Sequence, residues 1–386
     1  MHAVVVGAGP GGAAAALALA RAGATVDLVE KSAWPRAKTC GDGVSPLAIR
    51  ELASLGVAFA PGLELRRALV TTPGGVEFHG GWPAATPWGT IVERRSFDGA
   101  LVDAAIRAGA RFLPGTHVRT IASSDDGVTV TVAVDERERE LRADTAIVAD
   151  GANGSLATRL GFPPYRSRVV AIRAYATSRR SLRAEYGLFY DRPVSPGYGW
   201  IFPIAEHRAN VGVCVDEPAL ARAGGNLRLL LHRWLRENRF ARELFAEDVT
   251  LEDERGGIIP SGRSRRAAGR VFLVGDSAGV ADPFTAEGIY EAISSGQLAA
   301  QALTGPGGID AARGRYERAL RTLDCNERVA RALRATFNVA IGPYARYAAS
   351  HARFADRLMT DVFFSKPNWA KFMWGLHFGH PTAPLR

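Results

Sequence analysis

The chain has 386 residues, 47% of them hydrophobic, and a net charge of +9, which suits one large domain or two to three smaller ones. Its basic residues lack the aromatic–basic pattern of a nucleic-acid binder, and three widely spaced cysteines without a CxxC pair predict neither disulfides nor a metal site. No segment is apolar for long enough to span a membrane, and the first strand starts too early for a signal peptide, so we expect a cytoplasmic protein.

A strand–helix–strand unit is predicted at the start of the chain. The apolar run 3–6 reads as a buried strand, and an Ala- and Leu-rich helix follows over about 11–22. Gly23 ends this helix, and the second strand, TVDLVE, closes on Glu30. This order of elements is typical of the first half of a dinucleotide-binding fold.

The turn between the first strand and the helix carries spaced glycines. Gly7 permits a tight turn, Gly9 lets the backbone approach a pyrophosphate, and Gly12 lets the helix pack closely on the strand. The helix N-terminus then offers free N–H groups to the phosphates. Glu30 is placed to accept hydrogen bonds from ribose hydroxyls and would repel a 2′-phosphate, which disfavours NADP here. These residues predict a dinucleotide site and leave NAD and FAD as alternatives.

The remaining elements are predicted to alternate between strands and helices. The first group is a loop over 31–45, a helix over 46–56, strands within 66–92, a helix over 97–110, a hairpin arm over 128–134 and a strand over 144–151. The second group is a β-rich stretch over 165–215, helices over 226–247, a strand over 270–276, a helix over 287–303 and helices over 310–386 interrupted by Pro343 and Pro367. The nucleotide-binding pieces are therefore dispersed, with a β-rich segment inserted between them.

Three motifs resemble segments of flavoprotein monooxygenases and reductases with the p-hydroxybenzoate hydroxylase fold. They are VERRSFDGALVDAA at 92–105, IVADGANGS at 147–155 and RVFLVGDSAGVADPFTAEGI at 270–289. The resemblance covers at least residues 1–305 and implies that the dinucleotide is FAD.

The same resemblance implies roles for individual residues. Asp276 would bind a ribityl hydroxyl, and Gly288 and Ile289 would begin a helix whose N–H groups stabilise negative charge on the reduced flavin. Together with the residues of the opening unit, the full set of expected cofactor-binding residues is Gly7, Gly9, Gly11, Gly12, Glu30, Lys31, Cys40, Gly41, Arg94, Val118, Asp150, Asp276, Gly288 and Ile289.

The expected fold class is α/β. A Rossmann-type FAD-binding domain would contain an inserted antiparallel β-sheet substrate domain, followed by C-terminal helices. The expected limits are 1–65, 93–164 and 256–305 for the FAD-binding domain, 66–92 and 165–255 for the substrate domain, and 306–386 for the helical region.

Further stretches are similar to the geranylgeranyl reductase family of FAD-dependent oxidoreductases. They are KTCGDGVSP at 38–46 and YGWIFPIAEHRANVGVCV at 198–215, together with DPFTAEGI at 282–289. Enzymes of this family use FAD to saturate isoprenoid double bonds in lipids, quinones or chlorophyll precursors. The resemblance therefore implies a reductase with an apolar isoprenoid substrate, and it places Cys40 and Gly41 near the isoalloxazine.

Alternation along one strand predicts a wall of the substrate site. Tyr198, Trp200 and Phe202 share one face of this strand, and with Pro203 they are the expected substrate-binding residues. Gly197 and Gly199 are expected to leave room for the ligand. A plain hydrophobic core is the alternative interpretation of the same pattern.

Cys40, Tyr198 and Trp200 are the predicted catalytic residues. NAD(P)H or a reduced carrier protein would supply electrons to FAD, and a hydride would then pass to one alkene carbon. Cys40, a tyrosine or water would supply the proton for the other carbon, while the aromatic faces of Tyr198 and Trp200 buffer cationic character. Cys214 and Cys325 are expected to be small core residues.

Alternatives for partner and activity stay open. The stretch FFSKPNWAKFMWGLHFGH at 363–380 suits either peripheral contact with a membrane or a helix docked on its own domain. The alternative activity is that of an FAD-dependent monooxygenase that hydroxylates a secondary metabolite. A noncatalytic, FAD-loaded lipid carrier is the third hypothesis.

Overall fold

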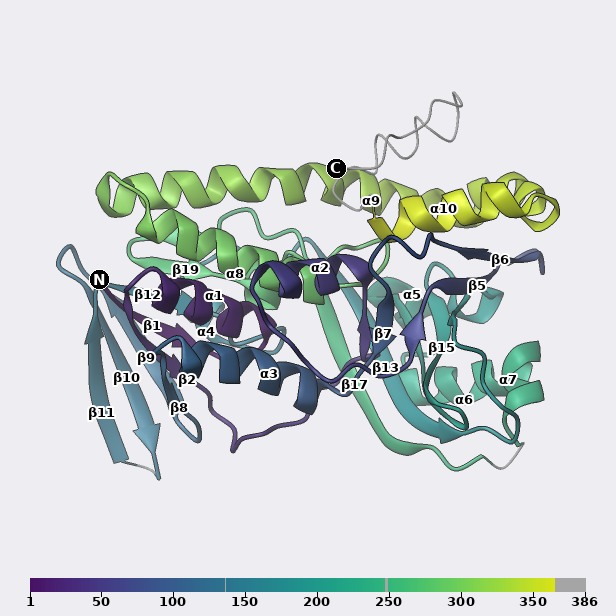
Figure 1. The fold of residues 1–386 in the computed structure, drawn as a ribbon, viewed down its shortest axis with the longest axis horizontal. Helices are drawn as coiled ribbons and strands as arrows, with labels where there is room; N and C mark the ends of the chain where they lie inside the picture. The colour runs from purple at the N-terminus through teal and green to yellow at the C-terminus, as the bar shows by residue number, and fades with distance from the viewer. Residues whose placement is uncertain (136, 247–248, 365–386) are drawn as a thin grey trace.

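The computed structural model describes residues 1–135, 137–246 and 249–364, apart from the side chains of 322–327, 335–341 and 364. Two large sheets lie side by side, and the two C-terminal helices run along one edge of the molecule across both (Figure 1). The predicted α/β architecture is confirmed, because the first sheet is mainly parallel and the second mainly antiparallel.

The first sheet contains the predicted strand–helix–strand unit. Its order is β18-β19-β12-β1-β2-β8, and all pairs are parallel except β18 with β19. The strands are β1 (His2–Val6), β2 (Thr25–Val29), β8 (Arg111–Leu113), β12 (Thr145–Val148), β18 (Ala267–Ala268) and β19 (Val271–Leu273). The helices packed with it are α1 (Pro10–Arg21), α3 (Arg94–Arg107) and α8 (Ile289–Thr304).

Helices α1 and α8 pack backbone to backbone. A Cβ added to Gly296 of α8 would lie 2.2 Å from the Gly11 carbonyl oxygen of α1, so only glycine allows this approach. The contact brings the N-termini of both helices to the same end of the sheet, where parallel strands place their ligand sites. Helix α3 begins at Arg94, three residues earlier than predicted, which puts that side chain in its first turn.

A small antiparallel sheet flanks the first one. It consists of β9 (His117–Ser123), β10 (Val128–Val134) and β11 (Arg137–Ala143) in the order β11-β10-β9. The predicted hairpin arm over 128–134 is confirmed by β10, in which Val128, Val130 and Val132 are buried.

The second large sheet has the order β17-β13-β16-β15-β14-β5-β6. Its strands are β5 (Arg67–Thr71), β6 (Glu77–Gly81), β13 (Ser167–Thr177), β14 (Tyr186–Phe189), β15 (Tyr198–Ala205), β16 (Arg208–Asp216) and β17 (Glu252–Ser261). One face packs on α5 (Glu217–Arg222), α6 (Leu227–Glu237) and α7 (Arg239–Leu244), with Trp234 at the centre of this core. The other face is left for the candidate site.

Shorter elements connect the sheets. They are β3 (Gly43–Val44), β4 (Glu64–Leu65) and β7 (Gly89–Ile91), which form a three-stranded sheet, and α2 (Pro46–Ser54), α4 (Leu156–Arg159), η1 (Arg192–Val194) and η2 (Gly275–Ala278).

The C-terminal region consists of α9 (Gly308–Ser350) and α10 (Ala352–Phe364). The predicted interruption at Pro343 is wrong, because α9 runs through this proline as one helix of 43 residues. A proline removes a single backbone hydrogen bond, and the bonds of a helix this long hold both sides of the gap. Pro367 and most of the stretch at 363–380 lie outside the described residues.

Sheet membership suggests one change to the expected domain limits. Strand β17 crosses the expected boundary at residue 256 and lies wholly in the second sheet, paired with β13. We therefore propose that the substrate domain extends to Ser261, since a strand belongs with the sheet that binds its backbone.

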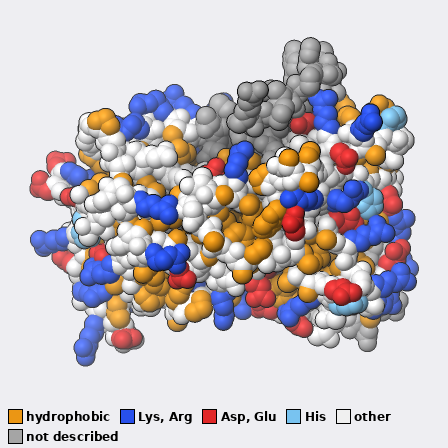
Figure 2. Space-filling model, viewed as in Figure 1, with side chains coloured by type: hydrophobic (Ala, Val, Ile, Leu, Met, Phe, Trp, Pro, Cys, Tyr) orange, Lys and Arg blue, Asp and Glu red, His pale blue; other side chains and the backbone are white. Residues whose placement is uncertain are grey.

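The surface mixes charges of both signs. Figure 2 shows Lys and Arg side chains scattered among acidic ones, with hydrophobic side chains gathered toward the middle of the face. Within the described residues, no helix combines the length and the apolar character needed to cross a bilayer.

Candidate functional site

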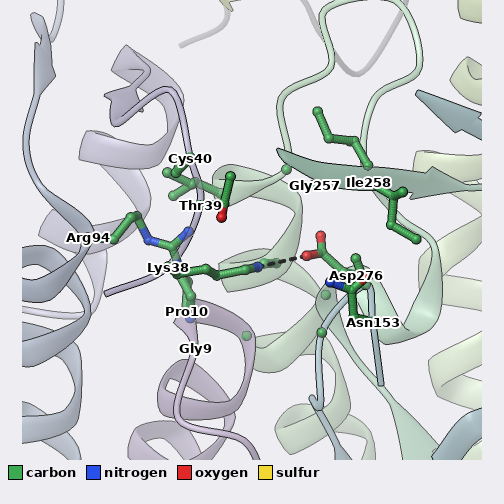
Figure 3. A pocket seen from close by; sticks show the side chains of 18 of the residues that line it. Gly9, Pro10, Lys38, Thr39, Cys40, Arg94, Asn153, Gly257, Ile258 and Asp276 are labelled. Carbon is green, nitrogen blue, oxygen red and sulfur yellow. Dashed lines mark hydrogen bonds and ion pairs between the residues drawn. The ribbon is translucent and has the colours of Figure 1, made fainter. Parts of the chain in front are cut away.

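A cavity of about 570 Å³ lies where the two large sheets meet. Its lining includes the Gly7–Gly11 turn, the loop around Cys40 and the first residues of α8. On the opposite side it continues along the second sheet, where Gly257 and Ile258 of β17 face the loop (Figure 3).

Most residues predicted from the sequence line this cavity. They are Gly7, Gly9, Gly11, Glu30, Lys31, Cys40, Gly41, Arg94, Val118, Asp150, Tyr198, Trp200, Phe202, Asp276, Gly288 and Ile289. Their individual roles stay predictions.

Two predicted residues are not part of the lining. Gly12 lies behind it, where a Cβ would come within 1.9 Å of the Gly7 carbonyl oxygen, so its role is to pack α1 on β1. Pro203 is buried but is absent from the lining because successive residues of a strand point to opposite faces, and Phe202 takes the cavity face.

The glycine turn after β1 and the N-termini of α1 and α8 have the geometry that FAD binding requires. Gly7 has φ +101°, and a Cβ there would lie 2.2 Å from the Ala149 carbonyl oxygen. Helix α1 starts at the cavity after Gly9, and α8 starts there after Gly288; neither helix has a capping side chain. The free N–H groups of the two helices are thus available to a pyrophosphate and to the anionic edge of a flavin.

Glu30 sits at the end of β2 in a dense set of donors. Its carboxylate accepts hydrogen bonds from Ala8 N at 3.0 Å, Ser32 N at 3.1 Å and Arg36 Nε at 3.1 Å. Arg36 also donates to Asp98 at 3.1 Å, so it ties β2 to α3. Arg36 was not predicted from the sequence, and its only signal was its place in the loop after the second strand.

We predict that Glu30→Gln weakens folding mainly at neutral pH. Burial raises the pKa of Glu30, but the Arg36 charge and the N–H groups of Ser32 and Ala8 bring it below the ordinary value. Such a carboxylate stabilises the fold above its unfolded pKa and loses its contribution as pH falls through the folded pKa. Urea unfolding should show a deficit of about 1–3 kcal/mol at neutral pH that shrinks in acid.

Glu243→Gln on the exposed side of α7 is the control for this prediction. It should change the free energy of unfolding by less than about 0.5 kcal/mol. A Glu30→Gln deficit of equal size in neutral and acidic buffer would contradict the ionic role of Glu30.

Cys40 lies beside a buried arginine. Arg94 donates to Asp98 through Nε at 2.8 Å and Nη2 at 2.9 Å, and its guanidinium also contacts the Cys40 thiol. Burial raises the pKa of Cys40, while the Arg94 charge works against this, and the net direction is upward. Cys40 is therefore held as a neutral thiol at neutral pH, which is the form that can donate a proton.

Lys38 reaches across the cavity to Asp276. Lys38 Nζ lies 2.8 Å from Asp276 Oδ2, with the two residues on opposite walls (Figure 3). Sequence analysis assigned no role to Lys38, because 238 residues separate the two partners. A cation here suits a ligand that carries phosphates.

Two rows of side chains form the wall of the second sheet. Tyr186, Leu188 and Tyr190 lie opposite Phe202, Trp200 and Tyr198 in register, and all six line the cavity. Ring centroids are 5.3 Å apart for Tyr186–Phe202 and 5.5 Å apart for Tyr190–Tyr198. The first row was not predicted from the sequence, although its Tyr-x-Leu-x-Tyr alternation is a signal of the same kind as that of the second row.

The hydroxyl group of Tyr198 forms a hydrogen bond within the protein. It donates to the Thr285 carbonyl oxygen at 2.6 Å, in the loop before α8. Burial raises the pKa of Tyr198 well above its ordinary value. Tyr198 therefore stays a neutral phenol, and its proton is already committed to this backbone oxygen.

Gly197 and Gly199 do not leave room for a ligand, contrary to the prediction. A Cβ at Gly199 would lie 2.2 Å from the Trp234 ring, and one at Gly197 would lie 1.8 Å from the Cys214 carbonyl oxygen. The space beside them is filled by this protein's own atoms. Cys214 is buried as expected and also lines the cavity, and the side chain of Cys325 lies outside the described residues.

Helix α10 closes one end of the wall. Val362 and Phe363 line the cavity, and the Phe363 ring lies 4.7 Å from Trp82 and 5.3 Å from Tyr186 between centroids. The apolar end of the cavity is thus built from elements far apart in the sequence. Within the described part of the chain, no group of His, Cys, Asp and Glu is arranged to hold a metal ion.

We predict that Gly212→Ala displaces Trp200. A Cβ at Gly212 of β16 would lie 2.2 Å from the Trp200 ring and 2.4 Å from the Ile172 carbonyl oxygen. Overpacking of this kind costs about 1–3 kcal/mol, which thermal or urea unfolding should detect. Gly256→Ala on β17 is the control, because its Cβ would have only ordinary contacts at 3.7 Å or more. Equal stability of the two variants would contradict the close packing of the Trp200 ring on Gly212.

Comparisons with known proteins identify a matching family, relatives and solved structures of the same fold. Residues 1–184 match the family described as FAD binding domain. The chain is 31% identical to menaquinone reductase from Mycolicibacterium smegmatis, over 96% of this chain and 94% of the relative. It is 32% identical to digeranylgeranylglycerophospholipid reductase 2 from Methanopyrus kandleri, over 77% of this chain and 75% of the relative. A solved geranylgeranyl bacteriochlorophyll reductase-like protein from Thermoplasma acidophilum shares the fold, with a TM-score of 0.80, 20% identity and coverage of 97% and 98%.

Proposed function

Since the chain belongs to the geranylgeranyl reductase family of FAD-dependent oxidoreductases, we propose that it saturates carbon–carbon double bonds of an isoprenoid chain carried by a quinone or a lipid. The observation that carries this proposal is the double row of aromatic and apolar side chains that continues from the cofactor end of the cavity. A polyprenyl chain is long, apolar and rich in alkenes, and such a wall suits it by burial alone.

FAD supplies hydride transfer when bound. We propose that the Gly7–Gly11 turn and the N-terminus of α1 hold its pyrophosphate and that Glu30 holds its ribose. Asp276 and Lys38 would hold the ribityl and phosphate region, and the N-terminus of α8 the flavin. The uncapped helix ends and the close backbone at Gly7 support this placement.

Cys40 and the aromatic wall would carry out the steps assigned to the protein. Cys40 is the best-placed proton donor, since it is a neutral thiol beside Arg94 in the loop that faces Trp200. Tyr198 would act through its ring face, because its hydroxyl is bound to Thr285. Trp200 and Tyr198 would exclude water and stabilise positive charge that develops on the alkene.

For the electron donor we propose NAD(P)H or a reduced carrier protein, acting on the bound flavin. Glu30 lines the cavity where the ribose would lie and would repel a 2′-phosphate, so NADPH would have to approach from outside the dinucleotide site. We also propose peripheral contact with a membrane, because the substrate chain is a membrane component. Sedimentation with liposomes tests this second point, and absence of binding in the full chain would reject it.

Product analysis under controlled oxygen tests the proposed reaction. The holoenzyme, reduced anaerobically, is mixed with a geranylgeranyl-bearing quinone or phospholipid, and the product is examined by mass spectrometry. We expect the gain of one pair of hydrogens for each saturated bond, without oxygen. A product formed only in air and labelled by oxygen-18 gas would instead establish the monooxygenase, and an unchanged lipid under both conditions would favour the carrier.

A further inference from the structure

Asn210 lies just behind the wall of the cavity and joins its two sides. It is on β16, has no exposed surface and is not among the lining residues. Its Oδ1 accepts a hydrogen bond from Trp200 Nε1 at 2.9 Å, and its Nδ2 donates to the Cys40 carbonyl oxygen at 3.1 Å and to Asp42 Oδ2 at 2.9 Å. One buried amide thus connects the aromatic wall with the loop that carries Cys40.

The loop is packed on the wall as well as bonded to it. Cβ atoms added to Gly41 and Gly43 would lie 3.5 Å from the Trp200 ring and 3.4 Å from the Phe202 ring. Both distances are ordinary van der Waals contacts, so the backbone of the loop lies directly against the two rings. Any shift of the loop relative to Trp200 would first have to break the bonds to Asn210.

Asp42 shows that this loop conformation depends on its partners. Its φ of +60° is left-handed, which costs a non-glycine residue about 1–2 kcal/mol. The buried carboxylate accepts a hydrogen bond from Tyr175 OH at 2.7 Å in addition to that from Asn210. The other charged groups that face it are Arg94 and Arg173, so the carboxylate is held from both the FAD side and the second sheet.

We infer that Asn210 is a positioning residue for the proposed reduction, because it fixes the loop that carries Cys40 against Trp200 and so keeps thiol and indole in one arrangement. The inference rests on the proposed function only for the reaction itself. The placement of the loop can be measured without any isoprenoid substrate.

A matched network on the other face of the same sheet provides the control. There Trp234 Nε1 donates to Asp191 at 2.8 Å, and Asn238 Nδ2 donates to the same carboxylate at 2.7 Å. Asn238 Oδ1 accepts a hydrogen bond from Ala241 N and so caps the start of α7. Asn238 is buried like Asn210 but packs in the α6–α7 core, away from the cavity. Asn238→Ala should reduce stability as Asn210→Ala does, but it should leave the reactivity of Cys40 unchanged.

The first experiment measures alkylation of Cys40 by iodoacetamide in the FAD-loaded protein, located by peptide mass spectrometry. Asn210→Ala removes both hydrogen bonds to the loop and should raise the rate at least about tenfold, since the loss of one buried hydrogen bond already corresponds to a factor of that order. Asn210→Asp keeps the acceptor for Trp200 but removes both N–H donors and faces Asp42 with a second carboxyl. The ratio of its alkylation rate to that of wild type should be largest at neutral pH and fall in acid. At low pH the carboxyl introduced at position 210 becomes protonated and donates to Asp42 again.

The second experiment measures anaerobic reduction of a geranylgeranyl-bearing quinone. Asn210→Ala should lower kcat about tenfold and leave KM and FAD content unchanged, because Asn210 does not itself line the cavity. Wild-type alkylation rates in both Asn210 variants, or the same increase in Asn238→Ala, would overturn the inference. If alkylation changes as expected but wild type reduces no alkene, the proposed function fails while the placement of the loop by Asn210 stands.

Discussion

Gly12→Ala should yield a protein that no longer retains FAD. The added Cβ would lie 1.9 Å from the Gly7 carbonyl oxygen and 3.1 Å from the Ala149 side chain. The backbone cannot move aside as a flexible side chain can, so α1 must shift away from β1. This shift displaces the free N–H groups at the start of α1 from the position in which they would bind the pyrophosphate. We expect a loss of stability of about 3 kcal/mol and a flavin content near zero, measured from the visible spectrum of the purified protein.

Gly99→Ala is the control for this variant. Gly99 lies within α3, where an added Cβ would meet nothing within 4 Å. Alanine in a helix is favoured over glycine by about 1 kcal/mol, so this variant should be slightly more stable and fully yellow. A Gly12→Ala protein with the flavin content of wild type would contradict the fit derived for the turn.

Trp200→Ala should remove most of the alkene reductase activity. Trp200 is 5% exposed and lies between Tyr198 and Phe202, with centroids 6.2 Å and 6.1 Å away, so its loss opens the middle of the wall. We expect kcat/KM to fall about a hundredfold, which corresponds to about 2.7 kcal/mol of transition-state stabilisation. Steady-state assays on folded, FAD-loaded variant measure this change.

The control for Trp200→Ala is Leu231→Ala. Leu231 is fully buried in the α6–α7 core on the other face of the sheet, and its truncation should cost about 2–5 kcal/mol of stability. It should leave kcat/KM unchanged in the folded fraction. A Trp200→Ala enzyme with wild-type turnover would exclude Trp200 from the reaction.

Local patterns were enough to predict the strand–helix–strand unit at the start of the chain. Gly7, Gly12 and Glu30 belong to one strand–helix–strand unit, in which sequence spacing alone brings the turn, the helix end and the acid together. The aromatic row on β15 was likewise readable, because period-two alternation fixes which side chains share a face. Pro203 was assigned to the site from its motif, and the same alternation accounts for its place on the opposite face.

Contacts between distant segments account for what sequence analysis missed. The pairing of Lys38 with Asp276 spans 238 residues, and that of Asn210 with Asp42 spans 168. Phe363 closes the wall from α10, whose position depends on how the last helices pack across β6. No local periodicity encodes such neighbours, because they follow from the order of strands in the sheets and not from spacing along the chain.

The most direct test of the account is an anaerobic mixing experiment with the flavin as the reporter. The yellow holoenzyme is reduced, freed of reductant, and mixed with a geranylgeranyl-bearing quinone or phospholipid in the absence of oxygen. We predict that the absorbance of oxidised flavin returns in step with loss of alkene, and more slowly in Trp200→Ala. Flavin that stays reduced until air is admitted, whatever isoprenoid is present, would contradict it.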